Sequence, residues 1–184
     1  MASEREARRR ACLDKAAAEV DGLVARGVVM GGNAFSAVLL VKGELAEGET
    51  GGEGAFSGAD GTALRASLAK LGYAPEDWEW LLSVDAGGEP LDAGLLREAV
   101  CALDPATVIA CDEAAASALR EAYADELAAL DALEEAMLVP GALARVLGMR
   151  VMNLGGFAVA LGDPHEKQVM WARLKRLPPL GEPI

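Results

Sequence analysis

Short, continuous apolar runs separated by turn residues recur along this chain, and they predict a buried β-sheet. The runs are rich in Val, Leu and Ile, and Gly, Asp or Pro lies near their ends. A strand that is apolar on both faces is typical of a parallel sheet covered by helices on both sides. The pattern predicts four strands, at residues 35–41, 78–84, 107–111 and 149–154.

Around these runs, apolar residues recur at helical spacing. The predicted helices cover residues 4–26, 63–71, 92–103, 112–137, 142–147 and 164–177. Asp92, Asp112 and Asp163 stand at the start of three of them as expected N-caps. The expected cap of the helix at 63–71 is Asp60 or Thr62. Strands that alternate with helices predict an α/β fold, namely a three-layer α/β/α sandwich around a central, mainly parallel four-stranded sheet.

The length of 184 residues suits a single domain, 1–184, in which a helical extension (1–30) precedes an α/β core (34–177). Hydrophobic residues make up 52% of the chain, which excludes a disordered protein. Every apolar run is far shorter than the roughly 20 residues of a membrane helix, and the charged N-terminus lacks the apolar centre of a secretory signal. We therefore expect a cytoplasmic protein that does not enter a membrane.

The chain has three cysteines, Cys12, Cys101 and Cys111, without a C-x-x-C pair, and a single histidine, His165. This set cannot build a disulfide framework or a four-cysteine metal centre within one chain. We therefore expect reduced thiols, no metal and no cofactor. Because His165 follows a proline early in a predicted helix, we expect it at the surface.

Charge is distributed unevenly. The net charge is −12, yet residues 1–10 and 165–184 each carry a net +2, so the segment between them carries −16. Affinity for nucleic acid comes mainly from neutralising phosphates, and an acidic field opposes it. Nucleic acid is therefore a disfavoured partner, while a homodimer remains open and the sequence names no other partner.

The most unusual segment is a long Gly-rich, acidic loop at residues 43–61. Long loops in compact domains are typically functional. In an open α/β sheet the ligand site lies beyond the carboxyl ends of the strands. The loop after Val41, the end of the second predicted strand near Ser83 and the loop after Asn153 are therefore expected to lie together.

From residue 41 to 73 the sequence reads VKGELAEGETGGEGAFSGADGTALRASLAKLGY. It resembles the first motif region of the uracil-DNA glycosylase superfamily, most closely the bacterial and archaeal branch that carries an iron–sulfur cluster. Gly43 and Glu44 match the start of that motif, and residues 56–61 match its Phe-x-Gly-x-x-Gly part. Later segments resemble further parts of the family in the same order, at residues 103–110 and 163–174.

The resemblance implies a uracil-DNA glycosylase-like fold and a candidate cleft. Glu44 corresponds to the carboxylate that orients the attacking water, and Phe56 to the ring that stacks on a flipped base. Gly43, Ser83 and Gly156 would line the same cleft. Both leading residues also have an ordinary structural interpretation: Phe56 as a core residue that anchors the loop, and Glu44 as a solvated acid.

The groups that would stabilise charge on the departing base are missing. Gly156 stands where the family has a histidine, Ser83 or Leu82 stands where it has an asparagine, and the cluster cysteines are absent. Each preorganised donor aimed at such a charge contributes about 2.7–4 kcal/mol. We therefore expect a degenerate active site in which Glu44 is vestigial.

The sequence accordingly favours a uracil-DNA glycosylase-like protein that serves as a catalytically inactive binding or interaction module. Two alternatives stay open. One is an enzyme that acts on a small nucleobase or nucleoside through Glu44, and the other is an active DNA glycosylase with stabilising groups from elsewhere in the chain. Either would be an N-glycosylase-type hydrolase.

Overall fold

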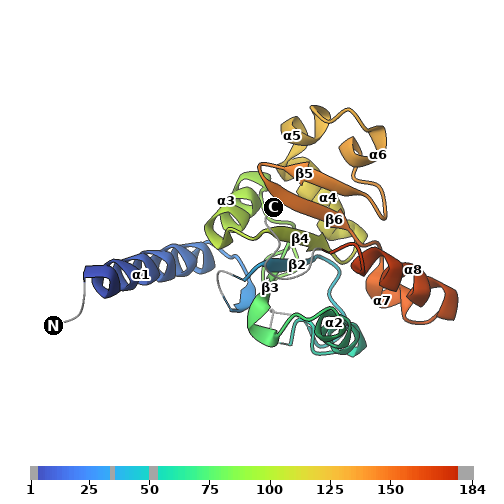
Figure 1. Cartoon of the computed structure of the whole chain (residues 1–184), viewed down its shortest axis with the longest axis horizontal. Helices are drawn as coiled ribbons and strands as arrows, with labels where there is room; N and C mark the ends of the chain where they lie inside the picture. Colours follow the sequence, from blue (N-terminus) through green and yellow to red (C-terminus); the bar gives the residue numbers. More distant parts are fainter. Residues whose placement is uncertain (1–3, 34–35, 50–53, 178–184) are drawn as a thin grey trace.

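The computed structural model describes residues 4–33, 36–49 and 54–177 and shows an α/β protein with one mixed, mostly parallel sheet (Figure 1). The sheet has six strands in the order β1-β3-β2-β4-β6-β5. The central strands β3, β2, β4 and β6 run parallel, and the outer strands β1 and β5 are antiparallel to their neighbours. The strands span β1 (Met30–Gly32), β2 (Val38–Lys42), β3 (Trp78–Leu82), β4 (Thr107–Ala110), β5 (Leu143–Val146) and β6 (Met149–Asn153).

Helices cover both faces of the sheet, and each face has its own apolar core. One core joins α1, α3 and α4 to residues such as Leu39 and Val108. The other joins α2, α7 and α8 to residues such as Leu40 and Ile109. The helices are α1 (Glu4–Ala25), α2 (Ala59–Lys70), α3 (Ala93–Leu103), α4 (Glu113–Ala122), α5 (Ala124–Ala128), α6 (Leu133–Ala136), α7 (Phe157–Ala160) and α8 (Pro164–Leu174), with a 3-10 turn, η1, at Pro75–Asp77.

The four strands predicted from apolar runs are β2, β3, β4 and β6, but the prediction of a four-stranded sheet is wrong. β1 has the sequence MGG, which carries no apolar run to recognise. The segment 142–147, predicted as a helical turn, contains β5 instead. Ala, Leu and Arg favour helices locally, but a tight hairpin with β6 pairs Ala144 with Val151 and overrides that propensity.

Three of the predicted helix caps are confirmed. The carboxylates of Asp92, Asp112 and Asp163 accept backbone N–H groups of the first turns of α3, α4 and α8. The prediction of Asp60 or Thr62 as the cap of α2 is wrong, because the N-cap is Gly58 and the Asp60 carboxylate accepts a hydrogen bond from Lys42 instead.

The predicted helix at 112–137 is divided into α4, α5 and α6. The first division falls at Tyr123, whose side chain is buried, and the second at residues 129–132. Neither turn contains Gly or Pro, so local sequence gave no sign of them. The predicted N-terminal helix is confirmed as α1, which projects from the body of the protein and packs through Leu23 near its end (Figure 1). No helix in the described ranges is both long and apolar enough to cross a membrane.

The strand order defines one special position in the sheet. From β2 the chain first crosses to β3 on one side and then returns to β4 on the other side. The two neighbours β2 and β4 therefore flank a topological switch point, where open α/β sheets bind ligands beyond the carboxyl ends of their strands. In this protein that position is the edge formed by Lys42, Cys111 and the residues after Asn153.

A buried acid in β3 generates a prediction about pH. Glu79 is 2% exposed, one of its carboxylate oxygens has no hydrogen-bond partner in the described parts of the chain, and burial raises its pKa to about 8. Between its ordinary pKa and about 8, the folded protein keeps this proton and the unfolded chain releases it. Stability therefore falls as pH rises through this range, by at most about 1.4 kcal/mol per pH unit for one proton.

Glu79→Gln should remove this loss, because the amide stays neutral in both states. Urea unfolding at pH 5.5 and at pH 8.5 measures the effect. We expect the wild-type protein to lose more stability between the two pH values than the variant does. Equal pH dependence of the two proteins would contradict the assignment.

Candidate functional site

The carboxyl ends of β2, β4 and β6 meet around a cavity of about 20 Å³. Glu44 follows β2, Cys111 and Asp112 follow β4, and Gly156 precedes α7 on the segment after β6. The other lining residues come mainly from the end of β2, from α2 and from α7: Lys42, Asp60, Leu64, Phe157, Ala158 and Val159. Such a volume holds about one water molecule, because one probe sphere needs about 10–15 Å³.

A buried ionic cluster forms one wall of this cavity. The Lys42 Nζ lies 2.6 Å from Oε2 of Glu49 and 2.6 Å from Oδ2 of Asp60. The side chains of Lys42 and Glu49 are each 4% exposed, and that of Asp60 is 11% exposed. Burial lowers the pKa of Lys42, but hydrogen bonds and charge from Asp60 and Glu49 outweigh it and raise the pKa above its ordinary value. The ammonium therefore remains charged at neutral pH.

Glu49 also fixes the Gly-rich loop. One carboxylate oxygen accepts the N–H of Ala46 at 2.7 Å, and the other accepts the N–H of Phe56 at 3.0 Å. With its bond to Lys42, this carboxylate joins two parts of the loop to the end of β2. The loop is therefore closed over the strand end by hydrogen bonds to a charged group, which are stronger than neutral ones.

Asp112 connects the same loop to the next strand. Its carboxylate accepts the N–H groups of Gly43 at 2.9 Å and Glu44 at 2.8 Å. It also accepts the N–H of Ala115 at 2.8 Å, which is the N-cap bond of α4. Three N–H groups that donate to one carboxylate fix the position of the Asp112 side chain. It orients the backbone of the loop, and its oxygens are occupied.

Phe56 lies in the core behind the ionic cluster. Its side chain is 1% exposed, and its ring centroid lies 5.3 Å from Lys42 Nζ and 6.3 Å from the Trp80 ring centroid. Its φ of 57° lies in the left-handed region, and its carbonyl approaches α2 so closely that a Cβ on Gly61 would lie 1.7 Å from the oxygen. The ring is a core contact, and no face of it is open to an incoming base.

The structure places all five predicted site residues at one edge of the sheet. Glu44 and Gly156 are exposed and line the cavity. Gly43 and Ser83 lie close together outside the cavity lining. A Cβ added to Gly43 would lie only 2.5 Å from the Ser83 Oγ. Ser83 is 2% exposed, and neither Ser83 nor Phe56 reaches the cavity.

The sequence reasoning missed Lys42, Glu49 and Asp60 as a unit. A lysine at the end of a wholly apolar strand was the available signal, because a buried ammonium needs a nearby carboxylate. The sequence predicts Asp60 as a helix cap, and nothing local distinguishes Glu49 from its acidic neighbours in the loop. The surface position predicted for His165 is confirmed.

The residues present do not fit the iron–sulfur cluster of the resembled branch. The chain has three cysteines, and of these Cys101 is exposed on α3 whereas Cys111 is buried beside the cavity, where burial raises its pKa. The side chain of Cys12 lies outside those described. Across the described residues, no group of three or more His, Cys, Asp or Glu side chains is arranged to hold a metal ion.

Comparison with known proteins adds no family. No protein-family model matches the chain, and no curated protein matches it.

The ionic cluster predicts a large effect of removing its cation. Lys42→Met leaves two buried carboxylates without a counter-charge, and we expect a loss of about 3–5 kcal/mol in the free energy of unfolding. The matched control Lys167→Met changes an exposed lysine of α8 and should stay within about 0.5 kcal/mol of wild type. Urea unfolding measures both variants.

Adding Glu49→Gln and Asp60→Asn to Lys42→Met should restore much of this loss, because the uncompensated charges are removed. A loss below about 1 kcal/mol for Lys42→Met alone would show that the cluster is not buried in solution.

The contact between Phe56 and α2 predicts opposite effects of two glycine substitutions. Gly61→Ala forces a Cβ into the Phe56 carbonyl, so we expect a loss of about 2 kcal/mol or more. Gly22→Ala lies in α1, where nothing stands within 4 Å of a new Cβ, and should gain up to about 1 kcal/mol from helix propensity. Urea unfolding curves of the two variants test the pair, and similar shifts would contradict it.

Proposed function

We propose that this protein is a non-catalytic binding or interaction module on a uracil-DNA glycosylase-like scaffold. The resemblance of residues 41–73 to the family motif supports the scaffold. The positions of Glu44 and Gly156 also support it, because the resemblance implies that both belong to one cleft and both line one cavity. Two later segments resemble the family in the same order along the chain. Residues 103–110 contain β4 and the loop before it, and residues 163–174 form α8 with its N-cap.

The observation that carries the proposal is that the protein's own side chains fill its switch-point crevice. Ligand pockets of proteins have volumes of about 300–1,000 Å³. Here the described residues leave about 20 Å³, because Glu49 of the loop and Asp60 of α2 pair with Lys42 at the end of β2 and Phe56 is buried behind them. A flipped base or a free nucleobase would have to displace a charged, hydrogen-bonded cluster before it could bind.

The electrostatics of the cavity also oppose glycosidic cleavage. Breaking an N-glycosidic bond leaves negative charge on the base, and catalysis requires donors aimed at that charge. The charged groups lining this cavity are the carboxylates of Glu44, Asp60 and Asp112 and one ammonium, Lys42, which two carboxylates already neutralise. A developing anion would therefore meet like charge.

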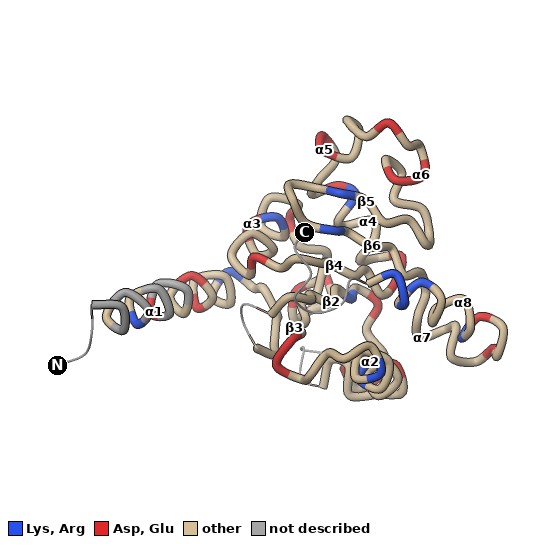
Figure 2. The backbone as a smooth tube through the Cα atoms, in the orientation of Figure 1, with Lys and Arg blue, Asp and Glu red and all other residues tan. Residues whose placement is uncertain are grey.

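The distribution of basic residues gives little support to DNA binding. Figure 2 places basic residues near β5 and the end of α8, among acidic ones. In that C-terminal region Arg173 donates to the Leu154 carbonyl at 2.6 Å and Arg176 to the Gly141 carbonyl at 2.5 Å. These guanidinium groups hold the segment after β6 and the turn before β5, which is a structural role.

A cleavage assay tests the proposal. A single-stranded oligonucleotide containing one uracil is incubated with the protein, and abasic sites are detected by alkaline strand cleavage, with an active uracil-DNA glycosylase as positive control. We expect no cleavage above the buffer blank for the wild type or for Glu44→Gln. Cleavage by the wild type that Glu44→Gln abolishes would overturn the proposal.

A binding measurement tests the closed crevice separately. Free uracil, titrated into isotopically labelled protein, should shift no amide resonance of Glu44, Asp112 or Gly156. Saturable shifts at these residues would instead favour an enzyme or binding site for a small nucleobase.

A further inference from the structure

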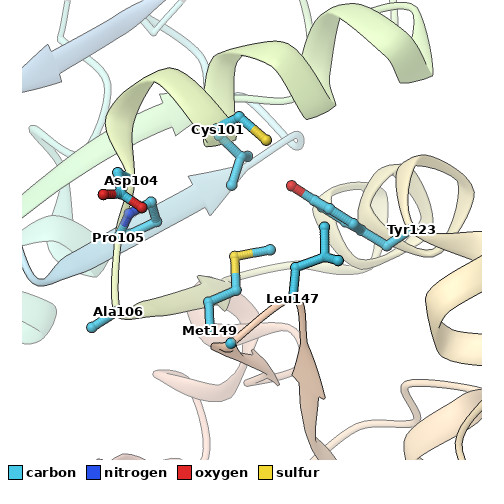
Figure 3. A pocket seen from close by; sticks show the side chains of 9 residues that line it. Cys101, Asp104, Pro105, Ala106, Tyr123, Leu147 and Met149 are labelled. Carbon is cyan, nitrogen blue, oxygen red and sulfur yellow. The ribbon is translucent and has the colours of Figure 1, made fainter. Parts of the chain in front are cut away.

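A second cavity lies at the opposite edge of the sheet from Glu44 and Gly156, at the amino ends of β4 and β6. It has a volume of about 360 Å³ and lies between the end of α3, the loop that enters β4, the end of α4 and the β5–β6 turn (Figure 3). Its walls include Cys101, Asp104, Tyr123, Leu147 and Met149. The volume falls within the range of about 300–1,000 Å³ that small-molecule sites occupy.

One polar group in this cavity lacks a partner. Tyr123 is 1% exposed, and its buried hydroxyl has no hydrogen-bond partner in the described ranges. In Figure 3 the hydroxyl points away from α4 into the cavity, toward Cys101 on the opposite wall. Buried hydroxyls are nearly always hydrogen-bonded. A buried hydroxyl without a described partner, beside a cavity, can therefore donate a hydrogen bond to a ligand that binds there.

The Tyr123 ring is held in place from behind. The Arg97 guanidinium lies 5.1 Å from the ring centroid, and it also donates to the Ala122 carbonyl at 3.1 Å and to the Glu126 carboxylate at 2.9 Å. Burial raises the pKa of the phenol, so it stays protonated at neutral pH. The ring is therefore in place before a ligand binds, and a bound acceptor would have to orient only the hydroxyl hydrogen.

The remaining walls define the rest of the ligand. Val100, Leu147 and Met149 supply apolar surface, and Leu147 is 63% exposed at a φ of 49° in the β5–β6 turn. The Asp104 carboxylate is the charged group of the lining, and the protein carries a net charge of −12. The negative charge would repel an anionic ligand. An uncharged compound with a hydrogen-bond acceptor and an apolar part fits the Tyr123 donor, the apolar walls and the Asp104 carboxylate.

We propose that this cavity binds a small, uncharged carbonyl compound, whose oxygen accepts a hydrogen bond from the Tyr123 hydroxyl while its apolar part packs against Val100, Leu147 and Met149. The site lies at the opposite edge of the sheet from Glu44 and Gly156, so it is independent of the function proposed above.

Two probes of equal shape isolate the hydrogen bond. Acetophenone carries a carbonyl, and α-methylstyrene replaces its oxygen with a methylene group. Binding of each is measured from the Met149 methyl resonance in protein labelled at methionine methyl groups, with Met149→Leu identifying that resonance. We expect saturable shifts with acetophenone. Absence of saturation at millimolar concentration would overturn the proposal.

Tyr123→Phe keeps the ring and removes only the donor. It should weaken acetophenone binding by about 3- to 10-fold and leave α-methylstyrene binding within about twofold. The matched control is Tyr73→Phe, at a buried tyrosine of the other core, which should change neither affinity. An equal loss for both probes, or an equal effect of the control, would overturn the assignment of the donor.

Two further measurements keep the test decisive. Because the Tyr123 hydroxyl has no hydrogen-bond partner among the described residues, the urea midpoint of Tyr123→Phe should equal or exceed that of wild type, and a lower midpoint would show that the hydroxyl is already bonded. Benzoate has nearly the shape of acetophenone but is anionic, so it should bind at least about tenfold more weakly. Tighter binding of benzoate would overturn the proposed neutral ligand.

Discussion

The buried pairing of Lys42 with Glu49 and Asp60 is the interaction on which the carboxyl edge of this protein depends. Two carboxylates and one ammonium are removed from water at the end of the central strand β2, and each carboxylate lies 2.6 Å from the ammonium. Desolvating charges is costly, and only close pairing with further hydrogen bonds offsets that cost. The loop must therefore keep the path that brings Glu49 and the start of α2 to Lys42.

This constraint explains why the two edges of the sheet differ. At the carboxyl edge the ionic cluster and the two loop N–H groups that donate to Asp112, those of Gly43 and Glu44, hold the loop against β2 and β4, so little space remains. At the amino edge the β5–β6 hairpin and the turn at Tyr123 hold the walls apart and leave a cavity of about 360 Å³. The usual ligand position of an α/β sheet is thus closed, and a less usual position is open.

Much of the fold followed from local pattern. The central strands were predictable because each is apolar on both faces, and three helices were predictable because Asp92, Asp112 and Asp163 bond to N–H groups only two or three residues away. β5 was missed because its residues favour a helix until β6 pairs with it. The candidate site was only partly predictable: its edge followed from the positions of the strand ends, and the interpretation of Phe56 as a core residue is confirmed by its burial, but the pairing of Lys42 with Glu49 and Asp60 could not be foreseen.

The sequence by itself determined the alternation of strands and helices and the edge at which Glu44 and Gly156 meet, because those depend on periodicity and on the geometry of parallel strands. Only the tertiary structure decided that Glu49 and Asp60 are the acids that pair with Lys42 and that the Tyr123 hydroxyl has no hydrogen-bond partner among the described residues. Both outcomes depend on how residues from different elements are brought together. Burial sets the energy of a charge or of a hydroxyl, and it exists only once the helices have packed on the sheet.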